Sequence, residues 1–276
     1  MRESNTPHPA VVVGIDGSQA AIQAAEWAVD EAASREIPLR LLHVIPDNVE
    51  PAPFAAVGNV QMEIEYGETA LRIVSAAVEA TGKPVKAETE LLRGNPAKIL
   101  IAESRSAAMI CIGSVGIGRF ARALLGSTAA ELAEAAHCPV AIIRTRQSRP
   151  KPGSPLIVAA VSEAPDGEQV VELAIHEAQI RHAPVLAVDV LRADTGHTPN
   201  DELDGRVKDW GRRHPGVEIY AGATRNGIAD FLAMMDKTIQ LAVIGSSDAN
   251  QVASLIGPQR RPVIGHAECS VLIARS

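Results

Sequence analysis

The sequence predicts two tandem α/β domains, each with a five-stranded, mainly parallel sheet that is covered by helices. Three observations support this fold class. Short β-branched runs alternate with longer segments of helical periodicity, and the first half of the chain recurs in the second. Hydrophobic residues make up 46% of the chain but aromatic residues only 3%, so small aliphatic side chains must build the cores. Parallel strands that are buried on both faces have this aliphatic character.

Apolar or alternating runs predict five strands in the first half, at about 11–15, 39–45, 85–92, 109–112 and 140–143. Segments of helical periodicity lie between them, at about 19–35, 62–80, 96–105 and 127–136. Ser18 is placed to cap the first of these helices, and Pro96 stands in the first turn of the third. The alternating order implies a parallel sheet with helices on both faces. Ligands of such sheets bind outside the carboxyl ends of the strands, where the strand order reverses.

The second half repeats several blocks of the first half in the same order. EWAVDEAASREIPLRLLHV corresponds to ELAIHEAQIRHAPVLAVDV, and MICIGS corresponds to LAVIGS. Between the halves, the segment TRQSRPKPGSP is rich in proline and basic residues and has no apolar periodicity. We therefore predict a first domain at 1–146, a linker at 147–154 and a second domain at 155–276.

Net charge and apolar content exclude several classes of protein. The formal net charge is −7 and the isoelectric point is near 5.6, which disfavours nucleic acid and anionic membranes as partners. The sequence shows neither a signal peptide nor a membrane span, so a cytoplasmic protein is expected. Its three cysteines stand apart in apolar stretches, which predicts buried thiols rather than disulfides or a zinc site.

A glycine-rich segment follows the predicted strand at 109–112. Gly113 and Gly116 are separated by two residues, and nine more lead to Gly126 and then Ser127 at the head of a helix. Glycines let backbone amides approach phosphate oxygens, and a helix start adds unpaired amides and the positive end of its dipole. The spacing therefore predicts an anion site, although glycines also mark ordinary turns and Ser127 could simply cap its helix.

The pattern G-x2-G-x9-G-[ST], placed between an apolar strand and an Ala-rich helix that leads to H-C-P-V, resembles the ATP-binding loop of universal stress proteins. The opening VVVGIDGS resembles the first strand of that family. The likeness covers essentially the whole chain, as a tandem member of the actinobacterial and mycobacterial kind. It implies Rossmann-like, adenine nucleotide α-hydrolase-like domains, ATP as the ligand with or without Mg²⁺, and a regulatory role in stress adaptation.

The resemblance also implies roles for individual residues. Asp16 would accept hydrogen bonds from the ribose or the adenine edge, and Val44 would offer backbone groups to adenine. Arg119 would either reach the phosphates or belong to a solvated basic edge. The implied nucleotide-binding residues are Gly14, Asp16, Val44, Gly113, Gly116, Arg119, Gly126, Ser127 and Thr128.

The second half departs from this pattern where the chemistry would be needed. Ser162 stands in the place of Asp16, and Asp248 replaces the second loop glycine with a carboxylate that would repel phosphate. Gly257 is followed by Pro258, which lacks the N–H that a phosphate would bind. We therefore predict that the second half does not bind ATP as the first half does.

Two other functions stay open. A slow ATPase, or an autophosphorylating enzyme with Ser127 or Thr128 as acceptor, would need metal ligands, a positioned nucleophile and charge stabilisation. Beyond Asp16 and the arginines the sequence offers no such set, so no catalytic residue and no metal site is predicted. The remaining alternative is an interaction module with a vestigial site. The resemblance further implies association through the last strand of each half, either as a homodimer or as an intrachain pseudo-dimer, with an unidentified downstream partner.

Two aromatic side chains outside the loop have alternative interpretations. His43 lies at a strand end near the predicted pocket and is interpreted as a structural histidine. Trp210 lies at a polar helix end, and an exposed tryptophan there would suggest a contact surface.

Overall fold

The computed structural model describes residues 9–47, 56–115, 125–144, 155–162, 166–190, 200–225, 227–235, 239–252 and 269–275. The chain forms two compact units, and the main division between them falls between strands β5 (Val140–Ile143) and β6 (Leu156–Val161). The predicted linker at 147–154 lies outside the described residues, so the domain boundaries remain a prediction.

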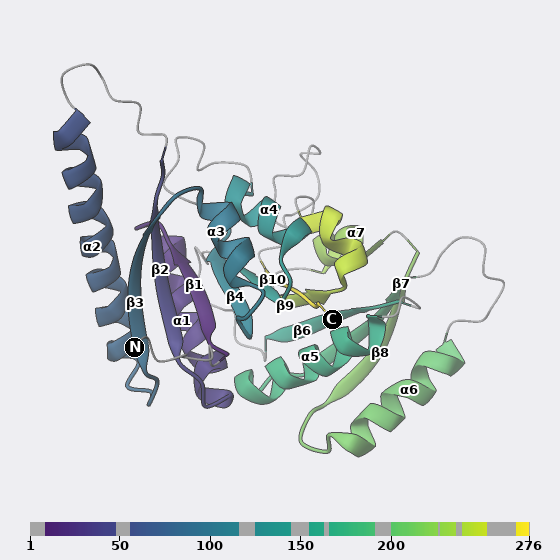
Figure 1. The fold of residues 1–276 in the computed structure, drawn as a ribbon. Helices are drawn as coiled ribbons and strands as arrows, with labels where there is room; N and C mark the ends of the chain where they lie inside the picture. The colour runs from purple at the N-terminus through teal and green to yellow at the C-terminus, as the bar shows by residue number, and fades with distance from the viewer. Residues whose placement is uncertain are drawn as a thin grey trace. The chain divides into compact units, whose positions relative to one another are not determined.

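The first unit is a parallel sheet with the strand order β3-β2-β1-β4-β5. Its remaining strands are β1 (Val11–Ile15), β2 (Leu39–Ile45), β3 (Ala87–Arg93) and β4 (Met109–Gly113). Its helices are α1 (Gln19–Ser34), α2 (Ala56–Ala80), α3 (Pro96–Glu103) and α4 (Ser127–Ala135). Helices α1 and α2 pack side by side on one face of this sheet and α3 and α4 on the other (Figure 1). This is the α/β fold that the sequence predicts.

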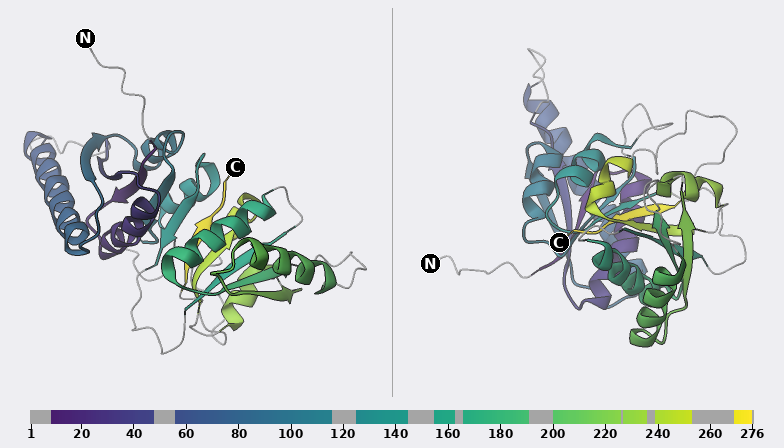
Figure 2. Two further views of the ribbon diagram at one scale, coloured as in Figure 1. Left: turned by 90° about the horizontal axis from the view of Figure 1, so that it is seen from below. Right: turned by 90° about the vertical axis from the view of Figure 1, so that its right-hand side faces the viewer.

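The second unit has the corresponding order β10-β9-β6-β7-β8, again with parallel strands. Its further strands are β7 (Val185–Val190), β8 (Ile219–Thr224), β9 (Ile239–Ile244) and β10 (Ser270–Ile273). Its helices are α5 (Gly167–Arg181), α6 (Asn200–Arg213), α7 (Gly227–Met234) and the short 3-10 helix η1 (Ser246–Gln251). Figure 2 shows α5 and α6 from two further sides.

The register of the strands confirms that the two halves are copies. Val11 pairs with Leu39 and Met109 in the first unit. Ile157 pairs with Val185 and Leu241 in the second unit. The repeated sequence blocks match Leu39 with Val185 and Met109 with Leu241. The residues at these strand ends therefore have counterparts in the other unit.

Local signals explain where the helices of the first unit begin. The Ser18 side chain accepts a hydrogen bond from the Ala21 amide at 3.1 Å, which confirms it as the N-cap of α1. Asn95 caps α3 in the same way, with Pro96 as the first helical residue. Alanine and β-branched side chains fill the core, and the three cysteines are buried thiols that form no disulfide, as expected.

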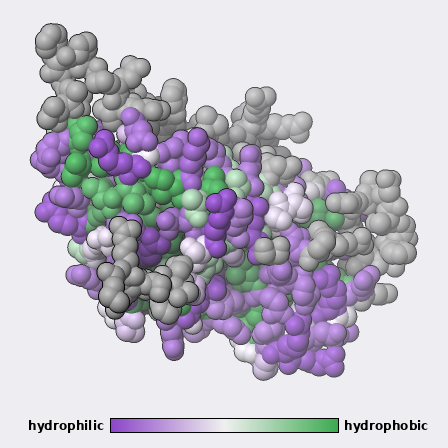
Figure 3. Space-filling model, in the orientation of Figure 1, coloured by the Kyte–Doolittle hydropathy of each residue, from purple (hydrophilic) through white to green (hydrophobic). Residues whose placement is uncertain are grey.

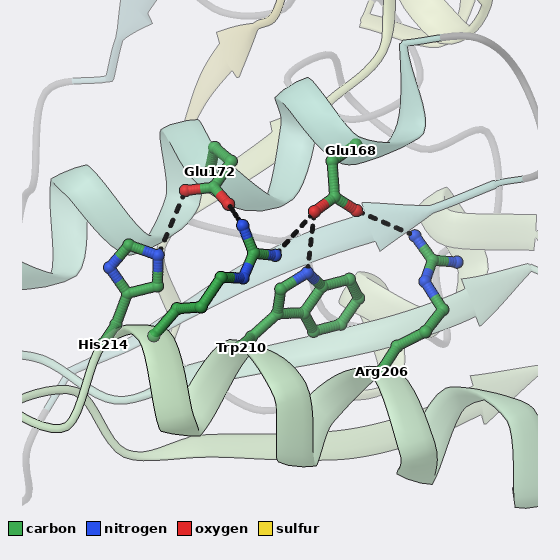
Figure 4. A network of polar contacts seen from close by, with 6 residues as sticks. Glu168, Glu172, Arg206, Trp210 and His214 are labelled. Carbon is green, nitrogen blue, oxygen red and sulfur yellow. Dashed lines mark hydrogen bonds and ion pairs between the residues drawn. The ribbon is translucent and has the colours of Figure 1, made fainter.

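A polar network holds α6 against α5 in the second unit (Figure 4). Trp210 is only 1% exposed, and its Nε1 donates to Glu168 at 3.1 Å. Arg213 bridges Glu168 and Glu172 at 2.7 and 2.6 Å. The exposed tryptophan that would have suggested a contact surface is therefore absent at this position, because the indole ring is buried, with the Arg206 guanidinium 4.8 Å from its centroid.

Among the described residues of the first unit, the large exposed apolar side chains lie along α2. Met62, Tyr66 and Ile73 are the large ones, and their spacing places them near one stripe of the helix. Figure 3 shows an apolar patch on the face of the first unit that it draws, next to the upper part of α2. In the described parts of the chain, no helix combines the length and the apolar character needed to cross a membrane.

Candidate nucleotide-binding site

The strand order of the first unit reverses between β1 and β4, which makes their carboxyl ends the expected ligand position. Asp16 follows β1 directly, and Gly113 is the last residue of β4. Val44 is the last residue but one of the adjacent β2 and is buried. Three of the predicted residues therefore stand at the ends of three neighbouring strands.

The turn between β1 and α1 is built around Asp16 and Gly17. The Asp16 Oδ1 accepts a hydrogen bond from the Ser18 amide at 2.9 Å, so the carboxylate helps to shape this turn. Gly17 has a φ of 84°, in the left-handed region that favours glycine. The turn places a half-buried carboxylate at the strand end.

The end of β4 lies very close to the start of α1. A Cβ at Gly113 would stand 2.7 Å from the Ala20 Cβ and 2.8 Å from the Ala20 carbonyl carbon, so only glycine fits here. The next residue, Ser114, is buried, and its amide donates to the Ile143 carbonyl of β5 at 2.8 Å. The backbone of the first unit is therefore packed tightly on both sides of this strand end.

The start of α4 returns to the same strand end. The Gly126 amide donates to the Ser114 carbonyl at 3.0 Å. Gly126 is the N-cap of α4 and offers no side-chain hydrogen bond to the first turn. Ser127 is the first helical residue and is exposed, while Thr128 is half-buried. The alternative in which Ser127 caps the helix is therefore wrong, because Gly126 takes the cap position.

The remaining predicted residues are placed differently. Gly14 lies inside β1, where an added Cβ would stand 3.0 Å from Leu100 of α3, so it faces α3. Gly116 and Arg119 lie outside the described residues. The structure therefore brings Asp16, Gly113 and Gly126 to one edge of the sheet and places Gly14 within it.

His43 and Tyr66 line the turn that carries Asp16. The two rings meet edge to face, with centroids 6.0 Å apart. His43 is buried, and this burial lowers the pKa of its imidazole, against the opposing effects of the Ile15 backbone and of the Asp16 and Glu63 carboxylates. A neutral histidine at neutral pH fits the structural role that the sequence predicts.

The corresponding strand end of the second unit is occupied by a side chain of the protein itself. Asp166 is buried, and its Oδ2 accepts hydrogen bonds from the Ser246 amide at 2.7 Å and from the Ser246 hydroxyl at 2.9 Å. A Cβ at Gly245 would stand 2.6 Å from the same oxygen. Because Gly245 and Ser246 correspond to Gly113 and Ser114, a carboxylate covers this copy of the strand end.

Sequence reasoning pointed to Asp248 as the acidic residue that repels phosphate. In the structure Asp248 belongs to η1, its amide donates to the Gly245 carbonyl at 3.1 Å, and its Oδ1 accepts from Gln251. The carboxylate of Asp166 also contacts this strand end, and the repulsion of phosphate by Asp248 stays a prediction. Gly257 and Pro258 lie outside the described residues.

Two residues that sequence reasoning missed therefore border these strand ends, Tyr66 and Asp166. The repeat could have revealed Asp166, because it aligns with Ala20, which packs on Gly113. No sequence signal marks Tyr66, since a tyrosine on a mostly exposed helix is ordinary. Within the described ranges, no group of three or more His, Cys, Asp or Glu residues could hold a metal ion.

Comparisons with known proteins identify the relatives of this chain. The profile of the universal stress protein family matches residues 9–144. A universal stress protein of Mycobacterium tuberculosis is 49% identical over 265 residues, which cover 96% of each chain. A second one from the same species is 40% identical over 280 residues, covering 98% of this chain and 97% of the relative.

A solved structure shares the fold of the whole chain. It is a universal stress protein from Archaeoglobus fulgidus, which superposes with a TM-score of 0.70 at 18% identity and covers 96% of each chain. The likeness in sequence to the mycobacterial proteins extends across both units. The chain belongs to the universal stress protein family.

Proposed function

We propose that the first unit binds ATP at the carboxyl ends of β1, β2 and β4, and that the second unit does not. The observation that carries this proposal is the hydrogen bond from the Gly126 amide to the Ser114 carbonyl, 3.0 Å long. It brings the start of α4, whose N-cap is a glycine, against the strand end beside Asp16. Backbone amides at a helix start are suited to anions.

In the proposed complex each part of the nucleotide has its own contacts. The first amides of α4, with the Ser127 and Thr128 hydroxyls, bind the phosphates. The close packing of Gly113 on Ala20 keeps side chains away from this path. Asp16 accepts from the ribose or the adenine edge, and the Val44 backbone contacts adenine. If ATP binds as its Mg²⁺ complex, the ion stays with the phosphates.

Asp166 supports a single site per chain. In the second unit its carboxylate accepts two hydrogen bonds from Ser246 at the strand end. Ala20 stands at the corresponding position of the first unit. An anionic ligand there would compete with a buried carboxylate and meet its negative charge. Ser162 stands at the position that corresponds to Asp16, so the second unit also lacks the carboxylate proposed to bind the adenosine part of ATP.

Binding without turnover makes the protein a regulator. ATP shifts a conformational or association equilibrium only by its differential affinity for the two states, and a downstream partner reads the result. A slow ATPase or self-phosphorylating activity is the second candidate, because the exposed Ser127 hydroxyl lies at the proposed phosphate position.

Association of the protein through β5 or β10 is a separate part of the proposal. It is tested by sedimentation with and without ATP.

The proposal is tested by equilibrium binding of ATP, ADP and AMP, each with and without Mg²⁺. The variants are Asp16→Ala and its counterpart Ser162→Ala, which is the matched control in the second unit. We expect one ATP per chain for the wild type and for Ser162→Ala. Asp16→Ala should weaken ATP binding by about tenfold, the loss expected for hydrogen bonds to a charged group.

Two results would overturn the proposal: no ATP bound by the wild type, or two ATP bound per chain with equal losses in both variants. Product analysis of the same samples separates the regulator from the enzyme. Phosphate release or a phosphorylated chain, abolished in Ser127→Ala but not by a change in the second unit, would favour the enzyme.

A further inference from the structure

Tyr66 reaches from α2 to the turn that carries Asp16. Its hydroxyl donates to the Asp16 backbone carbonyl at 3.0 Å. Partial burial and the carboxylates of Asp16 and Glu63 raise the pKa of Tyr66, so the phenol remains a hydrogen-bond donor throughout the neutral range. The contact links a helix distant in sequence to the strand end proposed to hold the nucleotide.

The neighbouring glycine shows how closely the phenol lies on this turn. A Cβ at Gly17 would stand 2.2 Å from the Tyr66 hydroxyl oxygen and 2.9 Å from its ring carbon Cζ. No real Cβ tolerates such distances, so a side chain at Gly17 would displace the tyrosine. The left-handed φ of 84° at Gly17 keeps the turn in the shape that accepts the phenol.

The phenol ring also packs on His43. The two rings meet edge to face at 6.0 Å, an arrangement that aromatic pairs favour. Gly67, on the same helix as Tyr66, leaves room for the imidazole, since a Cβ there would stand 2.6 Å from the His43 Cδ2. His43 directly precedes Val44 on β2. Tyr66 and His43 therefore form one aromatic wall beside the ends of β1 and β2.

We propose that Tyr66 is a positioning residue of the nucleotide site, which fixes the Asp16 turn and, together with His43, forms a side wall for the adenosine part of the ligand. This inference rests on the proposed function and adds to it a residue that belongs to α2. The tyrosine lies on the side of Asp16, whereas the phosphates are assigned to the start of α4. It should therefore affect ligands that contain adenosine and leave a bare polyphosphate unaffected.

The test compares Tyr66→Phe with Tyr220→Phe. These are the two tyrosines of the chain. Tyr220 is also partly exposed, and its hydroxyl also donates to an acceptor, Glu218 at 2.8 Å, but it lies on β8 of the second unit. Affinities for ATP and for inorganic tripolyphosphate are measured on the full-length chain, with the thermal unfolding midpoint of each variant as a check of folding.

We expect Tyr66→Phe to weaken ATP binding about three- to tenfold, as the loss of one hydrogen bond predicts. Its affinity for tripolyphosphate should stay unchanged, and Tyr220→Phe should change neither affinity. A Tyr66→Leu variant, which also removes the ring, should weaken ATP binding further.

Unchanged ATP affinity in both Tyr66 variants would overturn the inference and leave the proposed function standing. Equal losses for ATP and tripolyphosphate would also overturn it, because they would show an effect on the whole unit. Failure of the wild type to bind ATP would instead remove the proposed function, so the two failures are distinguished by the wild-type measurement.

Discussion

The two copies of the strand end differ most in what the backbone amide after the glycine does. In the first unit the Ser114 amide donates to the Ile143 carbonyl of β5, and Ala20 packs on Gly113. In the second unit the corresponding Ser246 amide donates to the carboxylate of Asp166. The same Gly-Ser pair thus ends both strands, but one end is covered by a methyl group and the other by a charge.

This difference teaches that one position at the start of a helix determines whether a methyl group or a carboxylate contacts the strand-end glycine. Ala20 and Asp166 are equivalent in the repeat, and each lies against the strand-end glycine of its own unit. The backbone around them follows the same strand order and register. The copies have diverged through side chains while the fold has been retained, as expected where function depends on a site rather than on the fold.

The largest expected effect comes from transferring the charge of the second unit to the first. Ala20→Asp should weaken ATP binding by at least about tenfold, because it places a carboxylate beside the path of the phosphates. Ala20→Asn has nearly the same size without the charge and should weaken binding less. Calorimetric titration measures both, and circular dichroism shows whether each variant is folded.

Equal losses of affinity in Ala20→Asp and Ala20→Asn would show that crowding at Gly113 causes the effect, because the two side chains differ in charge but hardly in volume. That outcome would mean that the charge of Asp166 does not account for the difference between the two units. The same titrations in high salt sharpen the result, since added salt screens an electrostatic penalty but not a steric one.

A smaller effect is expected when the second unit is made like the first. Asp166→Ala removes both hydrogen bonds to Ser246 and should lower the free energy of unfolding by about 1–3 kcal/mol. Ser246→Ala removes only the bond of the hydroxyl and should cost about 1 kcal/mol. Urea unfolding of the wild type, both single variants and the double variant gives the coupling between the two side chains.

Additive losses in the double variant would contradict the direct contact, because side chains that share a hydrogen bond should show a non-additive term. A second equivalent of ATP bound by Asp166→Ala would show that this carboxylate alone keeps the second unit free of nucleotide. A chain that still binds one ATP would show that Ser162 and the other departures from the pattern also matter.

The fold could be predicted from the sequence because its signals are local and repeated. Strands such as Val11–Ile15 are continuous apolar runs, and Ser18 and Asn95 cap helices as their residue types predict. The repeat then fixes the order of the second unit from that of the first. The sequence also predicts that Asp16 and Gly113 stand at strand ends, and the structure places them there; their role in binding stays a prediction.

The side walls of the site could not be predicted in this way. The distance between Tyr66 and Asp16 depends on how α2 packs on the sheet, which no local pattern records. The effect of Asp248 on phosphate stays a prediction. The contact of Asp166 with Gly245 joins residues far apart in the sequence, and it depends on how the start of α5 packs against the end of β9.

The smallest effect concerns the ends of β2 and β7, where His43 of the first unit corresponds to Asp189 of the second. Because burial lowers the pKa of His43 below its usual value of 6.5, the unfolded chain binds this proton more readily than the folded chain. His43 therefore contributes a loss of stability as the pH falls through 6.5 toward the lower folded pKa, and no loss above 6.5.

The difference in unfolding midpoint between pH 7.5 and 5.5 should accordingly be smaller in His43→Gln than in the wild type. His137→Gln, at an exposed histidine, is the matched control and should keep the wild-type difference. Thermal unfolding at both pH values measures these differences in midpoint. Carboxylates also titrate on the acid side, so the effect of His43 is read from the comparison between variants. An equal pH difference in all three chains would mean that the imidazole is solvated in both states, and the aromatic wall of the first unit would then be open to water.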